Sequence, residues 1–458
     1  MTSTAAAWDR VDDGASRTRV EAEAALPRDP DARQRIAVLM PDLGGGGVQK
    51  MTLSLAAALS ARGHEVDIVV YQPAGELEPM VPPQLRVRHL RPSSRLRGRL
   101  LPLVADPGAM GQLLLPVLLA RKPAPTLVYL RALAGYLRER RPDALLAAAP
   151  HQNLEAVWAR RLAGVPTRLL ISERTVPSQI LPASPMWRNR FLPPLMRRAY
   201  QQADVIVAVS KALAEDLAAV TGIPRPRITA IYNPVVGPDI EALAAEPVDH
   251  PWFAPGQPPV ILGVGRLSDQ KDFATLIRAF AKVRATREAR LVIFGAAKDA
   301  AKTELRRGEL STLARQLGVA EHVDAPGFTA NPFAYMARAA LFVLSSRYEG
   351  LPGVLIQAMA TGCPVVSTDC PSGPREILEG GRWGPLVPVG DQAGIAAAIA
   401  GVLDHPLPPE LLKRRAREFS VERAVQRYLE VLFGESSLAD GSTTADRSSS
   451  AGAGATSV

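Results

Sequence analysis

The residues best suited to chemistry lie in a loop between an apolar run and a helical pattern. The loop residues are Glu349, Gly350, Leu351, Pro352 and Gly353. The run before them, AALFVLSS at 339–346, is apolar almost throughout, as a parallel strand covered on both faces must be. Ligands of open α/β sheets bind at the carboxyl ends of such strands. Because glycines let a ligand approach the backbone and a helix N-terminus favours an anion, this loop predicts a diphosphate site.

A second loop supplies positive charge. Arg266 and Lys271 lie at and just beyond the carboxyl end of a predicted strand at 259–267. Two fixed cations there would stabilise the charge that develops on a departing diphosphate, so this chemistry requires no metal ion and no other cofactor. Taken by itself, the segment is equally well explained as a surface loop with two solvated cations.

In combination these motifs resemble the retaining GT-B glycosyltransferases of family 4, whose signature is Glu-x7-Glu. The spacing from Glu349 to position 357 is the same, but Gln357 replaces the second Glu. The resemblance runs from about residue 35 to residue 433. It implies that Glu349 positions the sugar, that Arg266 and Lys271 hold the diphosphate, and that Gln357 touches the ribose. A Gln carbonyl still accepts hydrogen bonds, so nucleotide binding should survive the replacement.

Two more residues at predicted strand ends match positions that such enzymes use. His151 follows the apolar run at 144–150, and the resemblance implies that it contacts the donor sugar near the reacting carbon and steadies positive charge there. A lone histidine is more often structural. Glu173 and Arg174 follow the predicted strand at 168–173 and resemble a sugar-side or acceptor-side pair. A simple surface ion pair is the alternative for them.

A run of four glycines, Gly44 to Gly47, follows the first predicted strand. It is not a P-loop, because no glycine precedes Lys50, and no GxGxxG motif is present. The second strand ends at Gln72 without the acidic residue that would hold the ribose of NAD. In the glycosyltransferase interpretation, Gly46 and Gly47 let donor or acceptor approach the backbone.

Strand and helix patterns alternate in two series, which predicts an α/β protein with two Rossmann-like, doubly wound domains. The resemblance adds that they face each other across a cleft and that a C-terminal helix crosses back. We expect five segments: a disordered extension (1–34), an acceptor-side domain (35–235, with the crossing helix at 420–435), a Pro-rich linker (236–258), a nucleotide-sugar domain (259–419) and a disordered tail (436–458). Cys363 and Cys370 flank one apolar strand and are predicted to be core thiols.

The net charge of +9 is concentrated between residues 86 and 141. The twelve cations of this basic segment are Arg86, Arg88, Arg91, Arg95, Arg97, Arg99, Arg121, Lys122, Arg131, Arg138, Arg140 and Arg141. They frame an apolar stretch at 100–120 that Pro and Gly interrupt too often for a spanning helix. Residues 86–122 are predicted either to lie in the interface of an anionic membrane or to form a hairpin with a solvated arginine face.

These features together predict a hexosyltransferase that takes its sugar from UDP or GDP, with retention of configuration. The expected acceptor is a glycan or a polyprenyl-linked lipid of polysaccharide or glycolipid synthesis, and no nucleic-acid partner is expected. The expected location is the cytoplasm, at the inner face of the plasma membrane in the interfacial interpretation. A nucleotide-sugar epimerase of the same fold is one alternative. A catalytically idle sugar-nucleotide binding protein, suggested by Gln357, is the other.

Overall fold

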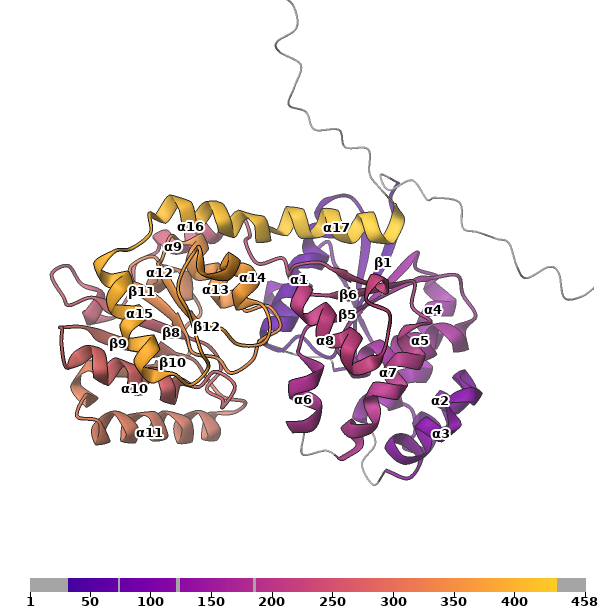
Figure 1. The fold of residues 1–458 in the computed structure, drawn as a ribbon. Helices are drawn as coiled ribbons and strands as arrows, with labels where there is room; N and C mark the ends of the chain where they lie inside the picture. Colours follow the sequence, from indigo (N-terminus) through magenta and orange to yellow (C-terminus); the bar gives the residue numbers. More distant parts are fainter. Residues whose placement is uncertain (1–31, 73–74, 121–123, 184–186, 435–458) are drawn as a thin grey trace, which may run out of the picture. The chain divides into compact units, whose positions relative to one another are not determined.

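The computed structural model describes residues 32–72, 75–120, 124–183 and 187–434. The segments predicted to be disordered, 1–34 and 436–458, lie outside the described residues except for 32–34. Arg33–Tyr428 form one unit, which contains both β-sheets, and the end of the last helix is assigned to the other. Figure 1 shows the elements in chain order.

The first sheet has seven strands in the order β3-β2-β1-β4-β5-β6-β7. Their bounds are Arg35–Met40 (β1), Glu65–Val70 (β2), Arg86–His89 (β3), Ala144–Ala148 (β4), Arg168–Glu173 (β5), Val205–Ala208 (β6) and Ile228–Ala230 (β7). All pairs are parallel, and β1 pairs with β2 on one side and β4 on the other. The order of the strands therefore reverses at β1 and β4, which is where doubly wound sheets bind ligands.

Helices connect these strands, as parallel pairing requires. Their bounds are Gly47–Ala61 (α1), Arg95–Ala105 (α2), Met110–Leu113 (α3), Leu130–Arg140 (α4), Pro150–Ala163 (α5), Pro177–Ala183 (α6), Leu192–Tyr200 (α7) and Lys211–Thr221 (α8). Helices α5 and α8 each end at a glycine with positive φ, Gly164 and Gly222, which is the conformation that a left-handed C-terminal cap needs.

The second sheet has six parallel strands in the order β10-β9-β8-β11-β12-β13. Their bounds are Val260–Val264 (β8), Arg290–Phe294 (β9), Val323–Gly327 (β10), Leu341–Leu344 (β11), Val365–Thr368 (β12) and Leu386–Val387 (β13). The accompanying helices are Ile240–Ala245 (α9), Phe273–Arg284 (α10), Ala300–Gln316 (α11), Pro332–Met336 (α12), Gly353–Ala360 (α13), Pro374–Ile377 (α14), Gln392–Asp404 (α15), Pro409–Ala416 (α16) and Val421–Phe433 (α17).

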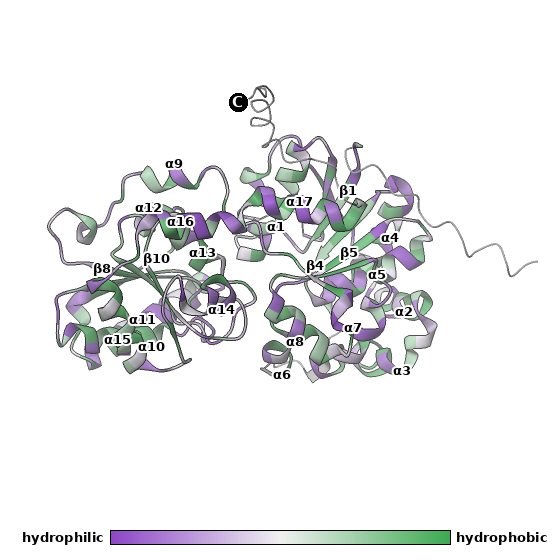
Figure 2. Ribbon diagram, turned by 45° about the horizontal axis from the view of Figure 1, so that its top comes forward, coloured by the Kyte–Doolittle hydropathy of each residue, from purple (hydrophilic) through white to green (hydrophobic). Residues whose placement is uncertain are grey.

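Strand β11 shows why its sequence is apolar throughout. Leu341 and Val343 belong to the cluster that includes residues of α10 and α15, whereas Phe342 and Leu344 belong to the cluster that includes residues of α13. Successive side chains point to opposite faces, so both faces must be apolar when helices cover both. In Figure 2 the strands of both sheets are correspondingly hydrophobic.

The predicted fold class is confirmed. Strands are present in every segment where the alternation predicted one. The strand predicted at 168–173 has these bounds, and the other strands with predicted ranges are shorter by two to four residues. Strand β3 was not predicted, because its sequence, RVRH, alternates two arginines with other residues at a sheet edge and buries none of them fully. Cys363 and Cys370 are buried free thiols, as predicted, and burial raises the pKa of each to about 12.

The predicted linker, 236–258, contains helix α9, which is attached to the second sheet's helices. Asn331 caps α12 and also donates to the Leu243 carbonyl at 2.8 Å. Near the other end of the chain, Arg62 at the end of α1 donates to Gln426 Oε1 of α17 at 2.9 Å. Helix α17 therefore reaches back to the first sheet's elements. The exact domain boundaries remain a prediction.

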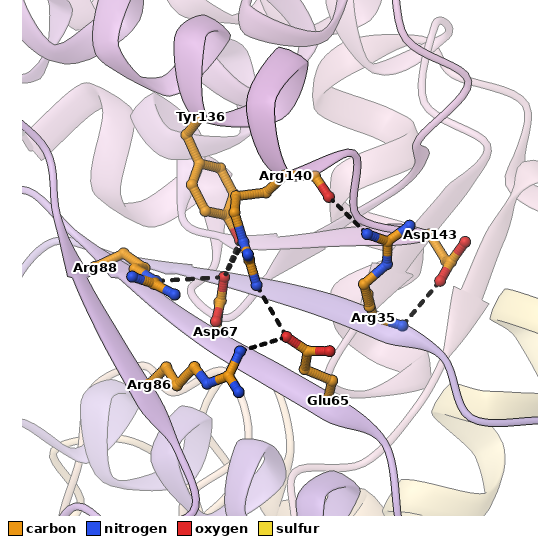
Figure 3. A network of polar contacts seen from close by, with 8 residues as sticks. All are labelled: Arg35, Glu65, Asp67, Arg86, Arg88, Tyr136, Arg140 and Asp143. Carbon is orange, nitrogen blue, oxygen red and sulfur yellow. Dashed lines mark hydrogen bonds and ion pairs between the residues drawn. The ribbon is translucent and has the colours of Figure 1, made fainter.

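A network of charged residues closes the amino ends of β1, β2 and β3 (Figure 3). Asp67 is buried on β2, and its Oδ2 accepts from Tyr136 Oη at 2.9 Å and lies 3.5 Å from Arg140 Nε and 3.6 Å from Arg88 Nε. Glu65 accepts from Arg140 at 2.9 Å and from Arg86 at 2.7 Å. Arg140 and Tyr136 therefore hold α4 against the sheet, and Arg86 and Arg88 join β3 to β2.

Replacing Asp67 with Asn should destabilise this end of the sheet. The change leaves two arginines facing a neutral amide in a partly buried site, so the free energy of unfolding should fall by roughly 1–3 kcal/mol. Asp404→Asn is the control, since Asp404 pairs with Arg287 on the surface at 3.0 Å and such pairs contribute about 0–1 kcal/mol. Chemical denaturation followed by circular dichroism measures both. An equal loss in the two variants would contradict a structural role for the network.

Candidate functional site

Glu349 lies in the loop after β11 and is held by two neighbours. Its Oε1 accepts from Lys271 Nζ at 2.6 Å and from Ser346 Oγ at 2.7 Å. The backbone is fixed as well, because Glu349 N–H donates to the Pro371 carbonyl at 2.7 Å and Ser372 N–H donates to the Glu349 carbonyl at 2.9 Å. Glu349 is 8% exposed. The structure thus brings Glu349 and Lys271, two of the predicted site residues, into direct contact.

Two glycines allow close packing beside Lys271 at the ends of β8 and β9: Gly265 makes room for the lysine and Gly295 for the Gly265 carbonyl. A Cβ on Gly265 would lie 3.1 Å from Lys271 Cε, and a Cβ on Gly295 would lie 1.8 Å from the Gly265 carbonyl oxygen. Because a lysine has three N–H donors and Glu349 uses one, Lys271 keeps donors for a further anion. Arg266, on the same loop, is exposed, and its guanidinium forms no ion pair with any residue that the structure describes.

Gly350 was expected to admit a ligand, but in the structure another part of the chain makes the close approach. A Cβ on Gly350 would lie 2.1 Å from the Arg174 carbonyl oxygen. Leu351 is buried, and Pro352 precedes the first residue of α13, Gly353. Gln357 is half-buried one turn into α13, so the helix presents its N-terminus and Gln357 in the order that the motif predicts.

Serines and a glutamate that sequence reasoning passed over help to fix this loop. Ser210 and Ser372 both donate to the Gly350 carbonyl, at 3.1 and 2.8 Å. Glu376, in the short helix α14, accepts from Lys211 N–H at 2.9 Å at the start of α8 and from Tyr232 Oη at 2.6 Å. The contacts of Ser210 and Glu376 join segments more than a hundred residues apart, so no local pattern predicts them.

His151 lies in the first turn of α5, after a strained turn at the end of β4. Ala149, the residue before the helix, has φ 123° and ψ 149°, which L-residues rarely adopt. His151 is half-buried and lines a pocket together with Glu155 and Trp158 of the same helix. The structure therefore places His151 at a carboxyl strand edge, as expected, and on the wall of an apolar pocket, which was not expected.

Glu173 was predicted to touch substrate and is instead buried within the first domain's core, at 1% exposure. Its Oε1 accepts from Asn153 Nδ2 at 2.9 Å and from the Tyr200 hydroxyl. Burial raises the pKa of Glu173 to about 7, and the hydrogen bonds from Tyr200 and Asn153 oppose that rise. Arg174 beside it donates to Asn233 Oδ1 at 2.9 Å. Glu173 and Arg174 therefore do not form the surface ion pair that was the alternative.

The glycine turn before α1 is lined by polar side chains. Asp42 Oδ1 accepts from Gly44 N–H at 2.8 Å and from Gln49 Nε2 at 3.1 Å. A Cβ on Gly46 would lie 2.4 Å from Gln49 Oε1, whereas a Cβ on Gly47 would meet nothing within 4 Å. The space around Gly46 is thus filled by the protein's own Gln49, and the backbone of Gly47 is open.

The basic segment contains a hairpin with an exposed apolar surface. We call this surface the apolar ridge; its residues are Leu96, Leu100, Val104, Met110, Leu114, Leu115 and Leu119, each at least 40% exposed. In α2 the ridge recurs every four residues, which places it on one side of the helix. Arg99 donates to the carbonyls of Leu118 and Ala120, at 3.1 and 2.8 Å, and so ties the two arms together. Arg121 and Lys122 lie outside the described residues.

No single helix within the described ranges is long and apolar enough to cross a membrane. Arg95–Ala105 and Pro107–Leu118 reach that length and composition only as a pair, and the pair is bent by 105°. The described residues also hold no cluster of three or more His, Cys, Asp or Glu placed to bind a metal ion. That no metal is required remains a prediction.

Comparison with known families places both halves of the chain. Residues 46–234 match the family described as "Glycosyl transferase 4-like domain", and residues 258–405 match "Glycosyl transferases group 1". Among solved structures, HepE of Anabaena, determined with UDP and glucose, superposes with a TM-score of 0.66 at 20% identity over 87% of this chain and 99% of that one. WaaG, a glycosyltransferase of lipopolysaccharide biosynthesis, superposes with a TM-score of 0.60 at 15% identity over 87% of this chain and 100% of that one.

Two curated relatives carry names of defined activities. One is the N-acetylgalactosamine-N,N'-diacetylbacillosaminyl-diphospho-undecaprenol 4-alpha-N-acetylgalactosaminyltransferase of Campylobacter jejuni, 32% identical over 267 residues, which cover 58% of this chain and 68% of that protein. The other is the lipopolysaccharide 1,6-galactosyltransferase of Salmonella typhimurium, 31% identical over 237 residues, which cover 50% of this chain and 59% of that protein. The chain belongs to the group 1 glycosyl transferases and is a glycosyltransferase with the GT-B fold.

Proposed function

We propose that this glycosyltransferase moves a hexose-type sugar from a UDP- or GDP-sugar to a lipid-linked or glycan acceptor, with retention of configuration. The observation that carries the proposal is the contact of Glu349 with Lys271 just before α13, where a carboxylate suited to sugar hydroxyls and a cation suited to a diphosphate meet at one strand edge. HepE was determined with UDP and glucose, and the Campylobacter relative is named for a diphospho-undecaprenol substrate. Both support the proposed substrate classes.

In the proposed reaction, the bond between the anomeric carbon and the diphosphate breaks on the face where the acceptor oxygen bonds. The acceptor hydroxyl gives its proton to the departing phosphate oxygen, so no protein carboxylate has to act as a nucleophile. Lys271 and Arg266 stabilise the charge that grows on the diphosphate, and this charge is greatest in the transition state. Glu349, oriented by Ser346 and Lys271, accepts hydrogen bonds from the sugar hydroxyls. His151 steadies the positive charge that develops at the anomeric carbon.

Gln357 takes the ribose in this proposal. Its carbonyl accepts from one hydroxyl while its amide can donate to another oxygen, so it replaces a carboxylate with a neutral contact.

The apolar ridge gives access to the acceptor. With Arg91, Arg95 and Arg97 exposed beside it, the ridge would lie in the interface of an anionic membrane, at its inner face, and bring the site to a lipid-linked acceptor.

A donor screen tests the proposed function against its two alternatives. Incubation with radiolabelled UDP- and GDP-hexoses, with and without EDTA, should give transfer to lipid-extract acceptors or slow hydrolysis of one donor. A new epimer of the donor would instead identify an epimerase. Binding without turnover of any donor would identify the idle binding protein that Gln357 suggests.

Arg266→Ala and Lys271→Ala should each lower kcat by about 100-fold, or roughly 3 kcal/mol, because each removes a donor from the site where charge develops. Lys282→Ala is the control, since Lys282 is an exposed cation at the far end of α10. Thermal melts should accompany the kinetics, because Lys271 is also the partner of buried Glu349. Unchanged kcat in both variants with the true donor would refute the diphosphate assignment.

Gln357→Glu should preserve or tighten nucleotide binding. A carboxylate accepts stronger hydrogen bonds from ribose hydroxyls than an amide does, and the gain should be modest, roughly 1 kcal/mol. Isothermal titration calorimetry with UDP and GDP measures it. If the variant loses nucleotide binding altogether, Gln357 does not lie at the ribose and α13 is wrongly aligned with the motif.

Two triple variants test the membrane contact. Replacement of Arg91, Arg95 and Arg97 with Ser should weaken co-sedimentation with anionic vesicles, since each basic residue contributes about 1 kcal/mol near such a surface. Replacement of Leu96, Leu100 and Val104 with Ser should weaken it at unchanged charge. The control replaces the exposed cations Lys282, Lys302 and Arg315 with Ser. Arg99 is left intact because it holds the hairpin together.

High salt should release the wild-type protein from the vesicles more readily than the arginine variant. Donor hydrolysis should stay at the wild-type level in all three variants. Equal partition of the wild-type protein into neutral and anionic vesicles, or into neither, would refute membrane docking and leave the transferase proposal standing.

A further inference from the structure

Two adjacent serines just past the end of β11 contact the two charged residues of the candidate site. Ser345 and Ser346 are both buried, at 2% and 0% exposure. The Ser345 hydroxyl donates to the backbone carbonyl of Lys271 at 2.8 Å. The Ser346 hydroxyl donates to the side chain of Glu349, at Oε1, at 2.7 Å. Neighbouring side chains of one strand end are therefore bound to two different loops, one carrying the cation and the other the carboxylate.

A third buried hydroxyl fixes the backbone of this strand end. Thr368, the last residue of the neighbouring strand β12, donates through Oγ1 to the Ser346 carbonyl at 2.6 Å. Burial alone would be served by apolar residues, which fill β11 up to Leu344. A buried hydroxyl must find a hydrogen-bond partner, so it suits a position where it holds a particular group. The hydroxyls of Ser345 and Ser346 are thus better explained by the groups that they hold than by packing.

The bond from Ser346 decides which oxygen of Glu349 is available to a ligand. Lys271 Nζ and Ser346 Oγ both donate to Oε1, and no residue that the structure describes donates to Oε2. A carboxylate accepts hydrogen bonds through both oxygens, so Oε2 remains for a sugar hydroxyl. The terminal torsion of a glutamate is soft. Without Ser346 the carboxyl group could rotate while it stays paired with Lys271, and Oε2 would no longer have a fixed direction.

The bond from Ser345 fixes the peptide group that follows Lys271. The next residue, Asp272, has φ 47° and ψ 47°, a left-handed conformation that few L-residues adopt. Asp272 is also the N-cap of α10, where its side chain accepts from Thr275 N–H at 3.3 Å. The chain turns sharply at this point, and Ser345 holds the carbonyl on the Lys271 side of the turn. A shift of that peptide group would displace the lysine side chain relative to the strand edge.

We propose that Ser345 and Ser346 are positioning residues with separate targets. Ser346 orients Glu349 toward the donor sugar, and Ser345 places Lys271 for the diphosphate. The inference rests on the proposed function, which gives these roles to Glu349 and Lys271. Neither serine has to touch the substrate, because each acts through the group that it holds. Loss of one hydroxyl should therefore weaken recognition of one part of the donor more than of the other part.

The test measures two affinity ratios by isothermal titration calorimetry. The diphosphate ratio is the affinity for UDP divided by the affinity for UMP. The sugar ratio is the affinity for UDP-glucose or UDP-galactose, whichever binds more tightly, divided by the affinity for UDP. GMP, GDP and GDP-mannose form a second series, and the ratios are compared in the series that the wild-type protein binds more tightly.

Ser346→Ala should lower the sugar ratio about tenfold, because the lost hydrogen bond has a charged acceptor, and should change the diphosphate ratio much less. Ser345→Ala should lower the diphosphate ratio about fivefold and change the sugar ratio less. Ser367→Ala is the matched control, since Ser367 is equally buried on β12 and its hydroxyl donates to the Thr368 carbonyl at 2.8 Å. Both ratios should stay at the wild-type level in this control.

Thermal melts establish that the variants are folded. If an alanine variant does not fold, Ser345→Cys or Ser346→Cys replaces it, because a thiol fills the site and donates only weakly. The same ratio should then fall, by a smaller factor. Unchanged ratios in the folded variants, or equal losses of both ratios in the variants of Ser345 and Ser346, would overturn the separate positioning roles and leave the transferase proposal standing. A wild-type protein that binds no member of either nucleotide series would overturn the transferase proposal and the positioning roles with it.

Discussion

The contact between Lys271 and Glu349 is the interaction on which the candidate site depends, because it requires two strand ends of the second sheet to be placed within a few ångströms. Lys271 follows β8 and Glu349 follows β11, and these strands are neighbours in the sheet. Their parallel pairing sends both chains out of the same edge. The 2.6 Å bond then holds a carboxylate and an ammonium that neither loop could fix alone.

The fold could be predicted in most of its parts because its strands are covered on both faces. Such strands must be continuously apolar, and AALFVLSS and its counterparts are recognisable in the sequence for that reason. Strand β3 was not predicted, because it is an edge strand whose arginines pair with Glu65 and Asp67 of β2. In the sequence those arginines look like a run of surface charges. The register of β2 with β3 shows that they form ion pairs with the neighbouring strand.

The candidate site was predictable only where its residues follow strands directly. Glu349 and Gln357 are separated by the spacing of one short motif, and Lys271 closely follows a predicted strand, so all three can be located from the sequence alone. Glu173 shows the limit of this reasoning, since a carboxylate at a strand end can turn toward the core and find Asn153 and Tyr200 there. Ser210 and Glu376 stabilise the loops by contacts across long stretches of chain. No sequence period encodes such contacts, because they depend on how separate helices and loops pack.

Helix α5 contributes side chains both to a pocket and to the core of the first domain. Its face bearing His151, Glu155 and Trp158 closes the pocket, whereas Asn153 on the same helix supports Glu173 in the core. The helix begins directly after Ala149, whose positive φ is a conformation that L-residues rarely adopt. The apolar hairpin meets the same helix, since Pro116 and Val117 line the pocket on one side while Leu114 and Leu115 are exposed beside them. Because the hairpin supplies part of the pocket wall, a change in its position would alter the pocket that α5 lines.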